Sequence, residues 1–221
     1  MTRETLRSTL IESRITAIIR LDDLSAFEPL AQTLLDAGIR CMEFTLTNRD
    51  ALKAVKQLRK NNRIFDDGEA IVGIGSVRNR DDAQAAIDAG AQLLVSPTVV
   101  MDMIELANQN DILCAPGAYT PTEIDTAWQA GADIVKVFPA TALGPSYMKA
   151  VLAPLPDVCL MPTLSREPRF LGDLSLSPAD MDAYNQAVST FAPHCAVFNH
   201  MGAPAMSVPL HWSANNLPLG M

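Results

Sequence analysis

The chain has 221 residues, of which 48% are hydrophobic and 19% charged, a length and composition that suit one α/β domain with a substantial core. Its formal net charge of −8 and its pI near 4.8 argue against a nucleic-acid or anionic-membrane partner, because neither is attracted to an acidic surface. The N-terminus lacks an apolar signal core and no apolar run reaches the roughly 18–20 residues of a membrane span, so we expect a cytoplasmic protein.

Short apolar runs alternate along the chain with segments of helical periodicity. We expect strands at 16–20, 41–46, 70–75, 93–96, 112–115, 134–138 and 158–161, with helices at 25–37, 50–61, 81–89, 101–108, 121–130 and 146–152. Three times the order is helix end, Ala-Gly and apolar strand, at Gly38, Gly90 and Gly131. Glycine suits the left-handed backbone position that follows a helix, so the sequence predicts repeated βα units.

Strands this rich in Val, Ile, Leu and Ala, each followed by a helix, indicate an α/β fold with a parallel sheet covered on its outside. A closed (β/α)8 TIM barrel accounts for the pattern better than an open doubly wound sheet, because no Gly-x-Gly-x-x-Gly opens the first βα turn. In such a barrel the chemistry lies at the carboxyl ends of the strands. The cysteines have no paired spacing, so we expect neither a disulfide framework nor a zinc site from Cys41, Cys114, Cys159 and Cys195.

Two charged residues stand inside apolar, strand-like runs: Lys136 in the run 134–138 and Glu43 in the run 41–46. Burial disfavours the charged form of both side chains, which favours a nucleophilic amine at Lys136 and a proton-exchanging carboxyl at Glu43. Together they form the minimal set for Schiff-base chemistry on a carbonyl. Each also has a structural explanation, Lys136 as a snorkelling or ion-paired lysine and Glu43 as a salt-bridge partner.

The segments around these residues resemble those of the 2-keto-3-deoxy-6-phosphogluconate (KDPG) / 4-hydroxy-2-oxoglutarate (KHG) aldolases, a family of class I (Schiff-base) aldolases. The matching segments are 42–46 (MEFTL), 72–77 (VGIGSV), 95–97 (VSP), 115–123 (APGAYTPTE), 134–140 (IVKVFPA) and 161–163 (MPT). The resemblance covers residues 1–163, about three quarters of the chain. It implies a single aldolase-type barrel domain over 1–221, a homotrimer, and no need for a metal or other cofactor.

The resemblance also implies roles for individual residues. Lys136 would form the Schiff base with C2 of a 2-oxo acid, and Glu43 would act as the general acid/base. Ser76 stands where the family usually has threonine and would hold the substrate carboxylate or the C2 oxygen. Pro97 and Phe138 would form apolar walls of the pocket, and Thr163 would complete the substrate-binding set.

Two positions depart from the family pattern. Many members hold the pyruvate carboxylate with an arginine where this chain has Thr47, so Arg20 at the end of the first strand is the candidate clamp, the alternative being an ordinary surface arginine. The family continues with two glycines after the residue matched by Thr163, and glycine turns there cradle the phosphate. This chain has Leu164 and Ser165 instead, which puts the usual phosphate site in doubt.

The segment 164–221 diverges from the family. Residues 183–221 contain no Asp, Glu, Lys or Arg but carry all the histidines, at spacings that match no metal site: His194, His200 and His211. We expect a helix at 180–188 and the eighth strand at 194–198. The end, 203–221, could cap the barrel, lie on a neighbouring subunit or be disordered, and an altered reading frame would also produce such a tail.

The sequence therefore predicts an aldehyde-lyase of carbohydrate metabolism that cleaves KDPG to pyruvate and glyceraldehyde 3-phosphate, a reaction of the Entner–Doudoroff pathway. A non-phosphorylated 2-oxo acid such as 4-hydroxy-2-oxoglutarate is the alternative substrate, which the missing glycines favour. A third hypothesis is a catalytically weak barrel that binds 2-oxo acids or serves in an assembly.

Overall fold

Parallel strands form the centre of the first of two compact units into which the chain divides. The structure is a computed structural model that describes residues 2–140, 145–155, 157–158, 160–161, 209–212 and 218–220. The first unit comprises Met1–Phe138 and Asp157–Met161, and the second comprises Pro139–Pro156 and Pro162–Met221. All of the predicted site residues that the structure describes belong to the first unit.

The strands of the first unit pair with one another in sequence order, and every pair is parallel. One sheet contains β1 (Thr16–Ile19), β2 (Cys41–Thr45), β3 (Ile71–Gly75), β4 (Leu93–Val95) and β5 (Leu113–Ala115), and a second contains β6 (Gly117–Ala118), β7 (Val135–Val137) and β8 (Leu160–Met161). Only Pro116 separates β5 from β6, and its carbonyl oxygen accepts a hydrogen bond from the Lys136 N–H at 2.9 Å. The two short strands therefore form one continuous edge for β7. Proline has no N–H to donate, which accounts for the break between them.

This strand order is that of the predicted (β/α)8 barrel. The predicted strands and helices between residues 16 and 161 are confirmed to within two residues at each end. The eighth strand, predicted at 194–198, and the helix predicted at 180–188 lie outside the described residues. The single barrel domain over 1–221 stays a prediction for the same reason.

Helices follow the strands of the first unit: α2 (Phe27–Asp36), α3 (Asp50–Asn61), α5 (Arg80–Asp88), α6 (Met101–Gln109) and α7 (Pro121–Gln129). The three predicted glycine caps are confirmed, because Gly38, Gly90 and Gly131 have φ angles of 87°, 86° and 93°. After each glycine, the next N–H returns to a carbonyl of the helix, as in the 2.9 Å bond from Ile39 to the Leu34 oxygen. The same local turn thus redirects the chain into β2, β4 and β7.

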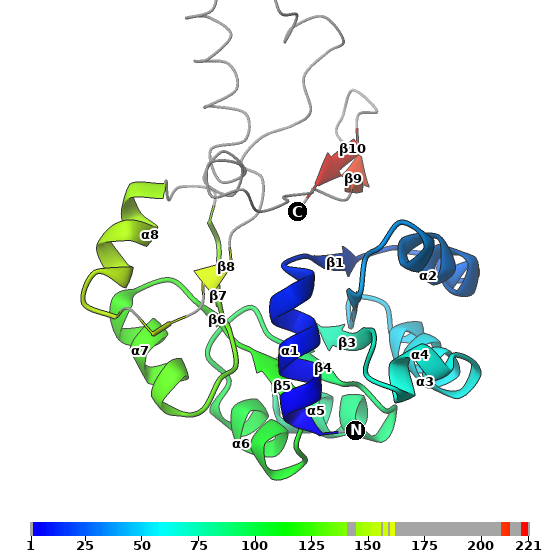
Figure 1. Cartoon of the computed structure of the whole chain (residues 1–221), viewed down its shortest axis with the longest axis horizontal. Helices are drawn as coiled ribbons and strands as arrows, with labels where there is room; N and C mark the ends of the chain where they lie inside the picture. Colours follow the sequence, from blue (N-terminus) through cyan, green and yellow to red (C-terminus); the bar gives the residue numbers. More distant parts are fainter. Residues whose placement is uncertain are drawn as a thin grey trace, which may run out of the picture. The chain divides into compact units, whose positions relative to one another are not determined.

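Two helices of the first unit were not predicted, α1 (Arg3–Ser13) and α4 (Arg63–Asp66). α1 covers the amino ends of the strands, where Leu6 and Leu10 join a buried cluster with the first residues of four strands, Cys41, Ile71, Leu93 and Leu113. Figure 1 shows α1, in blue, lying across these strands. Arg3 ties the helix to the segment before β7 by an ion pair with Asp133 at 2.8 Å. Since α1 covers the amino ends, the functional side chains are to be sought at the carboxyl ends.

The second unit contains α8 (Pro145–Leu152), which confirms the helix predicted at 146–152, and a short antiparallel pair of strands. β9 (Pro209–Trp212) pairs with β10 (Pro218–Gly220) inside the segment 203–221, whose structure the sequence had left open. In the described part of the chain, no helix has the length and apolar character needed to cross a membrane.

Candidate active site

Glu43 lies in the middle of β2, and its side chain is only 2% exposed. Strand pairing places it beside Ile18 on β1 and Gly73 on β3. Its carboxyl group leans toward Gly75, where an added Cβ would lie 2.6 Å from Oε1 and 2.9 Å from Cδ. The absence of a side chain at Gly75 therefore provides the space that the Glu43 carboxyl occupies.

Burial raises the pKa of Glu43, while the positive charges of Lys136 and Arg20 act in the opposite direction. The Glu43 carboxyl thus interacts electrostatically with both predicted cationic site residues, Lys136 on β7 and Arg20 at the end of β1. The structure brings together side chains from three strands. A carboxyl group with a raised pKa can hold and return a proton at higher pH than an ordinary surface glutamate.

Lys136 occupies the centre of β7, between the buried Val135 and Val137. The apolar run predicted burial for the lysine too, and this prediction was wrong, because its side chain is partly exposed. Successive side chains of a strand point to opposite faces, so the valines pack on one side while Lys136 extends on the other. Its Nζ lies 5.3 Å from the centroid of the Phe138 ring, a cation–π distance. The aromatic ring of Phe138 thus lies beside the amine.

Pro97 approaches the same region through its backbone. A Cβ added at Gly117 would clash with the carbonyl group of Pro97 and with the Ser96 carbonyl oxygen. Gly117 is the strand partner of Lys136, so the turn after β4 packs directly against the strand beside the lysine. The Ser96 hydroxyl donates to the Thr98 carbonyl at 2.6 Å and holds this turn.

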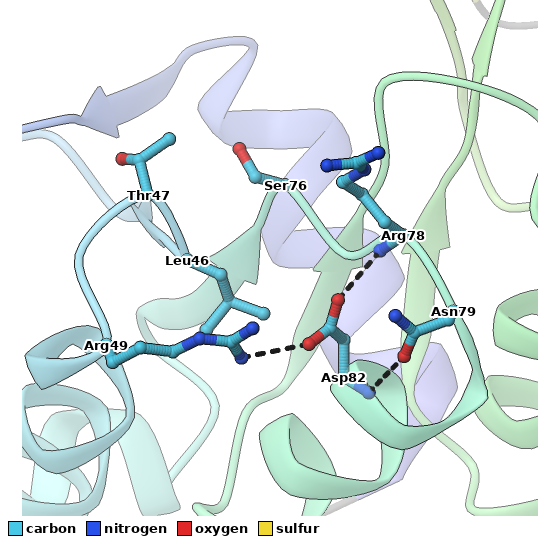
Figure 2. Close-up of a pocket in the computed structure, with 7 residues that line it drawn as sticks. All are labelled: Leu46, Thr47, Arg49, Ser76, Arg78, Asn79 and Asp82. Carbon is cyan, nitrogen blue, oxygen red and sulfur yellow. Dashed lines mark hydrogen bonds and ion pairs between the residues drawn. The ribbon is translucent and has the colours of Figure 1, made fainter.

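Ser76 follows Gly75 at the end of β3 and lines a cavity of about 330 Å³. Its φ of 62° is in the left-handed region, which residues other than glycine rarely adopt and which is common at functional sites. Figure 2 shows the cavity, which lies between the turns that follow β2 and β3 and is lined by Leu46, Thr47, Arg49, Ser76, Arg78, Asn79 and Asp82. Thr47, the position at which the family resemblance leads us to expect an arginine, also lines this cavity.

The structure thus gathers Arg20, Glu43, Lys136 and Phe138, with Ser76 and Pro97 on adjoining turns, and Thr163 lies outside the described residues. The sequence analysis missed Gly75 and Gly117 as parts of the site and Arg78 as a lining residue. Glycines inside strands were the available signal, since they mark close approach of other groups. Among the described residues, no group of three His, Cys, Asp or Glu side chains is arranged to hold a metal.

Comparison with known proteins identifies the protein family that this chain resembles. Residues 6–174 match the family of KDPG and KHG aldolases. The 2-dehydro-3-deoxy-phosphogluconate aldolase of Treponema pallidum is 32% identical over 160 residues, which cover 72% of this chain and 74% of that protein. The 2-dehydro-3-deoxy-6-phosphogalactonate aldolase of Escherichia coli is 31% identical over 148 residues, which cover 66% of this chain and 70% of that protein.

A solved structure supports both the fold and the family. The crystal structure of a 4-hydroxy-2-oxoglutarate / 2-dehydro-3-deoxyphosphogluconate aldolase aligns with a TM-score of 0.63 at 32% identity, over 71% of this chain and 76% of that chain. The predicted (β/α)8 barrel fold is confirmed by this likeness. The family match over residues 6–174 covers more than half of the chain and includes every described residue of the candidate site. The chain therefore belongs to the KDPG and KHG aldolase family and is an aldolase.

Proposed function

We propose that this aldolase cleaves KDPG to pyruvate and glyceraldehyde 3-phosphate through a Schiff base on Lys136, with Glu43 as the general acid/base. One observation carries the proposal: a fully enclosed carboxyl group, with a pKa raised by burial, lies within the electrostatic reach of the only lysine on the described barrel strands. A nucleophilic amine and a proton carrier are what carbonyl activation by a lysine needs.

The amine of Lys136 attacks the C2 ketone of the substrate, and loss of water from the carbinolamine leaves an iminium ion. Glu43 takes the proton of the C4 hydroxyl as the C3–C4 bond breaks, and the bonding electrons pass into the iminium to give an enamine. Glyceraldehyde 3-phosphate leaves. Glu43 then returns the proton to C3, and water hydrolyses the resulting iminium to free pyruvate and the Lys136 amine.

The other site residues would position the substrate. Arg20 would pair with the carboxylate through its planar guanidinium, and its charge already acts on Glu43. The Ser76 hydroxyl, at the end of β3, would contact the carboxylate or the C2 oxygen. Phe138 and Pro97 would form apolar walls of the pocket, because the Phe138 ring lies beside Lys136 Nζ and Pro97 packs on Gly117, the strand neighbour of the lysine.

Trapping the Schiff base tests the proposal. Wild-type protein, Lys136→Ala and the matched control Lys53→Ala, an exposed lysine on α3, are incubated with pyruvate and borohydride and weighed by intact-mass spectrometry. A reduced pyruvate adduct is expected on the wild type and on Lys53→Ala, and none on Lys136→Ala. An adduct that persists in Lys136→Ala would assign the chemistry to another amine.

A non-phosphorylated substrate such as 4-hydroxy-2-oxoglutarate is the second candidate. Leu164 and Ser165 replace the glycines that cradle phosphate in the family, and a side chain at such positions narrows the backbone approach that a phosphate needs. The names of the relatives include gluconate, galactonate and hydroxyoxoglutarate aldolases. Comparing kcat/KM for KDPG and 4-hydroxy-2-oxoglutarate, with inorganic phosphate as an inhibitor, decides between them.

We also propose, from the family resemblance, that the protein is a cytoplasmic homotrimer. Light scattering on the purified full chain tests the assembly, since a trimer has three times the chain mass of 23.9 kDa.

A further inference from the structure

The amine of Lys136 has an aromatic ring as its neighbour. Its Nζ lies 5.3 Å from the centroid of the Phe138 ring, within the distance of about 6 Å at which a ring face attracts a cation. None of the ion pairs in the described part of the chain involves Lys136. Among the described residues, the direct contact that favours a positive charge on the amine is therefore with the ring.

Glu43 cannot replace the ring as a partner for this charge. Its carboxyl interacts with both Lys136 and Arg20, so one carboxyl faces two cations. Burial also raises the pKa of Glu43, so it carries its negative charge only at higher pH than an ordinary glutamate. The ring attracts a cation at every pH, because its π-electrons do not titrate.

The backbone fixes the ring and the lysine on one face of the strand. Lys136 lies on β7 and Phe138 follows two positions later, so their side chains point to the same side. The N–H of Lys136 donates to the Pro116 carbonyl and that of Phe138 to the Ala118 carbonyl, each at 2.9 Å. Phe138 is still 38% exposed, so packing in the core does not account for the position of its ring.

The charge on the Lys136 nitrogen changes during the proposed reaction. The neutral amine attacks C2, its electron pair forms the N–C2 bond, and one of its protons passes to the oxygen. A second proton, supplied by solvent, lets water leave as the C2–O bond breaks, and the nitrogen keeps one hydrogen and a positive charge. Loss of that hydrogen would give a neutral imine, which accepts the electrons of the C3–C4 bond far less readily than the iminium.

We propose that the Phe138 ring stabilises the iminium on Lys136 relative to the neutral imine, so that the electron sink stays charged while the C3–C4 bond breaks. The inference rests on the proposed function, because it needs the Schiff base. The nitrogen stays on the same side chain when it bonds to C2, so the ring that lies beside the free amine also lies beside the iminium. Phe138 then has an electrostatic role besides that of an apolar wall.

Fluorination of the ring separates these two roles. Phe138 is replaced by mono-, di- and trifluorinated phenylalanine, in which each fluorine withdraws electron density from the ring face with little change in size. Phe138→Leu is added because it keeps an apolar side chain but has no π-electrons. The matched control is the same fluorinated series at Phe27, a partly exposed phenylalanine at the start of α2. A wall without an electrostatic role would be preserved throughout the fluorinated series.

The first readout is exchange of the pyruvate methyl protons with D2O, followed by NMR as a function of pH. Exchange reports the iminium, because loss of a C3 proton from the iminium gives the enamine. The alkaline limb of the exchange rate should move to lower pH with each fluorine, by about 0.4–0.7 pH unit in total, the value of a partly exposed cation–π contact. Phe138→Leu should match the trifluorinated protein, and the Phe27 series should match the wild type.

The second readout needs no Schiff base. Without pyruvate, acetic anhydride acetylates neutral amines, and peptide mass spectrometry gives the rate at Lys136 relative to Lys53, an exposed lysine in the same digest. Each fluorine weakens the attraction of the ring for the ammonium and should speed acetylation of Lys136, by about two- to fivefold over the series.

The two readouts separate failure of this inference from failure of the proposed function. An acetylation rate that does not change along the Phe138 series would overturn the electrostatic contact. An unchanged alkaline limb in the exchange experiment would overturn the action of the ring on the iminium. Absence of any exchange in the wild type would overturn the Schiff base and the iminium with it, whereas acetylation would still show whether the ring acts on the lysine.

Discussion

At the scale of single residues, Glu43 is a buried titratable group, so the effect of its ionisation on the stability of the fold can be measured. Burial raises its pKa above the ordinary 4.5, so the folded protein holds the proton more tightly than the unfolded chain. Below that ordinary pKa both states are protonated and Glu43 costs no stability. As pH rises, the unfolded state ionises first, and folding loses stability until pH passes the folded pKa.

Glu43→Gln should therefore gain stability relative to the wild type between pH 4 and pH 8, because the amide cannot ionise. Urea unfolding of both proteins at the two pH values measures the difference. The same substitution should lower kcat by roughly 10²–10⁴, the usual contribution of a general acid/base. A stability difference that does not change with pH would contradict the raised pKa.

Gly75 offers a second test at this scale, because the three atoms nearest to a Cβ added there all belong to Glu43. A Cβ at Gly75 would lie 2.6 Å from Glu43 Oε1, whereas a Cβ at Gly73 would lie 2.5 Å from the backbone oxygen of Leu93. Gly75→Ala should displace the carboxyl and lower kcat by roughly ten- to hundred-fold, as small misplacements of catalytic groups do. Gly73→Ala should instead lower the melting temperature, because strand β4 must move. Equal losses of activity and stability in the two variants would show that Gly75 serves the sheet alone.

These two residues also show how far the site could be predicted from the sequence. Lys136 and Glu43 stood out because charged residues are rare in apolar strands, and the structure places them within electrostatic reach of each other. Which side chain fills the space left by Gly75 depends on strand register, and the direction of the Arg78 guanidinium depends on a turn. Neither property can be predicted from local composition or periodicity.

At the scale of elements, strong local signals were confirmed and weak ones were missed. The Ala-Gly caps fix the ends of three helices through a backbone conformation that glycine adopts without penalty. α1 lacks such a signal, because its apolar face within 3–13 consists of little more than Leu6 and Leu10 among polar residues. Its helix is held by tertiary contacts, which sequence periodicity does not report.

Arg3 is the polar anchor of α1. It pairs with Asp133 at 2.8 Å, and it also donates to the Asn108 oxygen at 2.6 Å and to the Gly131 carbonyl at 3.2 Å. Asp133 in turn accepts the Cys114 N–H at 2.9 Å, so its carboxylate joins α1 to β5 and to the segment before β7.

Arg3→Ala should lower the free energy of unfolding by about 1–3 kcal/mol, because it leaves a largely buried carboxylate without its charge partner. Arg7→Ala, an exposed arginine of the same helix, is the control and should change stability by less than about 0.5 kcal/mol. Denaturant titrations of the three proteins provide the measurement. The pairing explanation would fail if both variants lost the same stability.

At the scale of the whole molecule, the core and the site belong to one unit, so ligand binding and resistance to unfolding should be linked. The thiols of Cys41 and Cys114 report on that core, since both are buried. Burial raises the pKa of Cys41 to about 11. Burial, with the nearby charge of Asp133, raises that of Cys114 to about 12. Neither thiol should react with iodoacetamide at pH 8 unless the first unit opens.

Pyruvate should slow alkylation of both thiols, because a ligand that binds only the folded state stabilises it by RT ln(1 + [L]/Kd). At ten times Kd the opened population falls about elevenfold, and alkylation should slow by the same factor where opening is in rapid equilibrium. Peptide mass spectrometry assigns the rate to each cysteine. Lys136→Ala should abolish most of the protection, whereas the exposed-lysine variant Lys53→Ala should keep it. Protection that survives in Lys136→Ala would mean that pyruvate stabilises the first unit without forming a bond to the lysine.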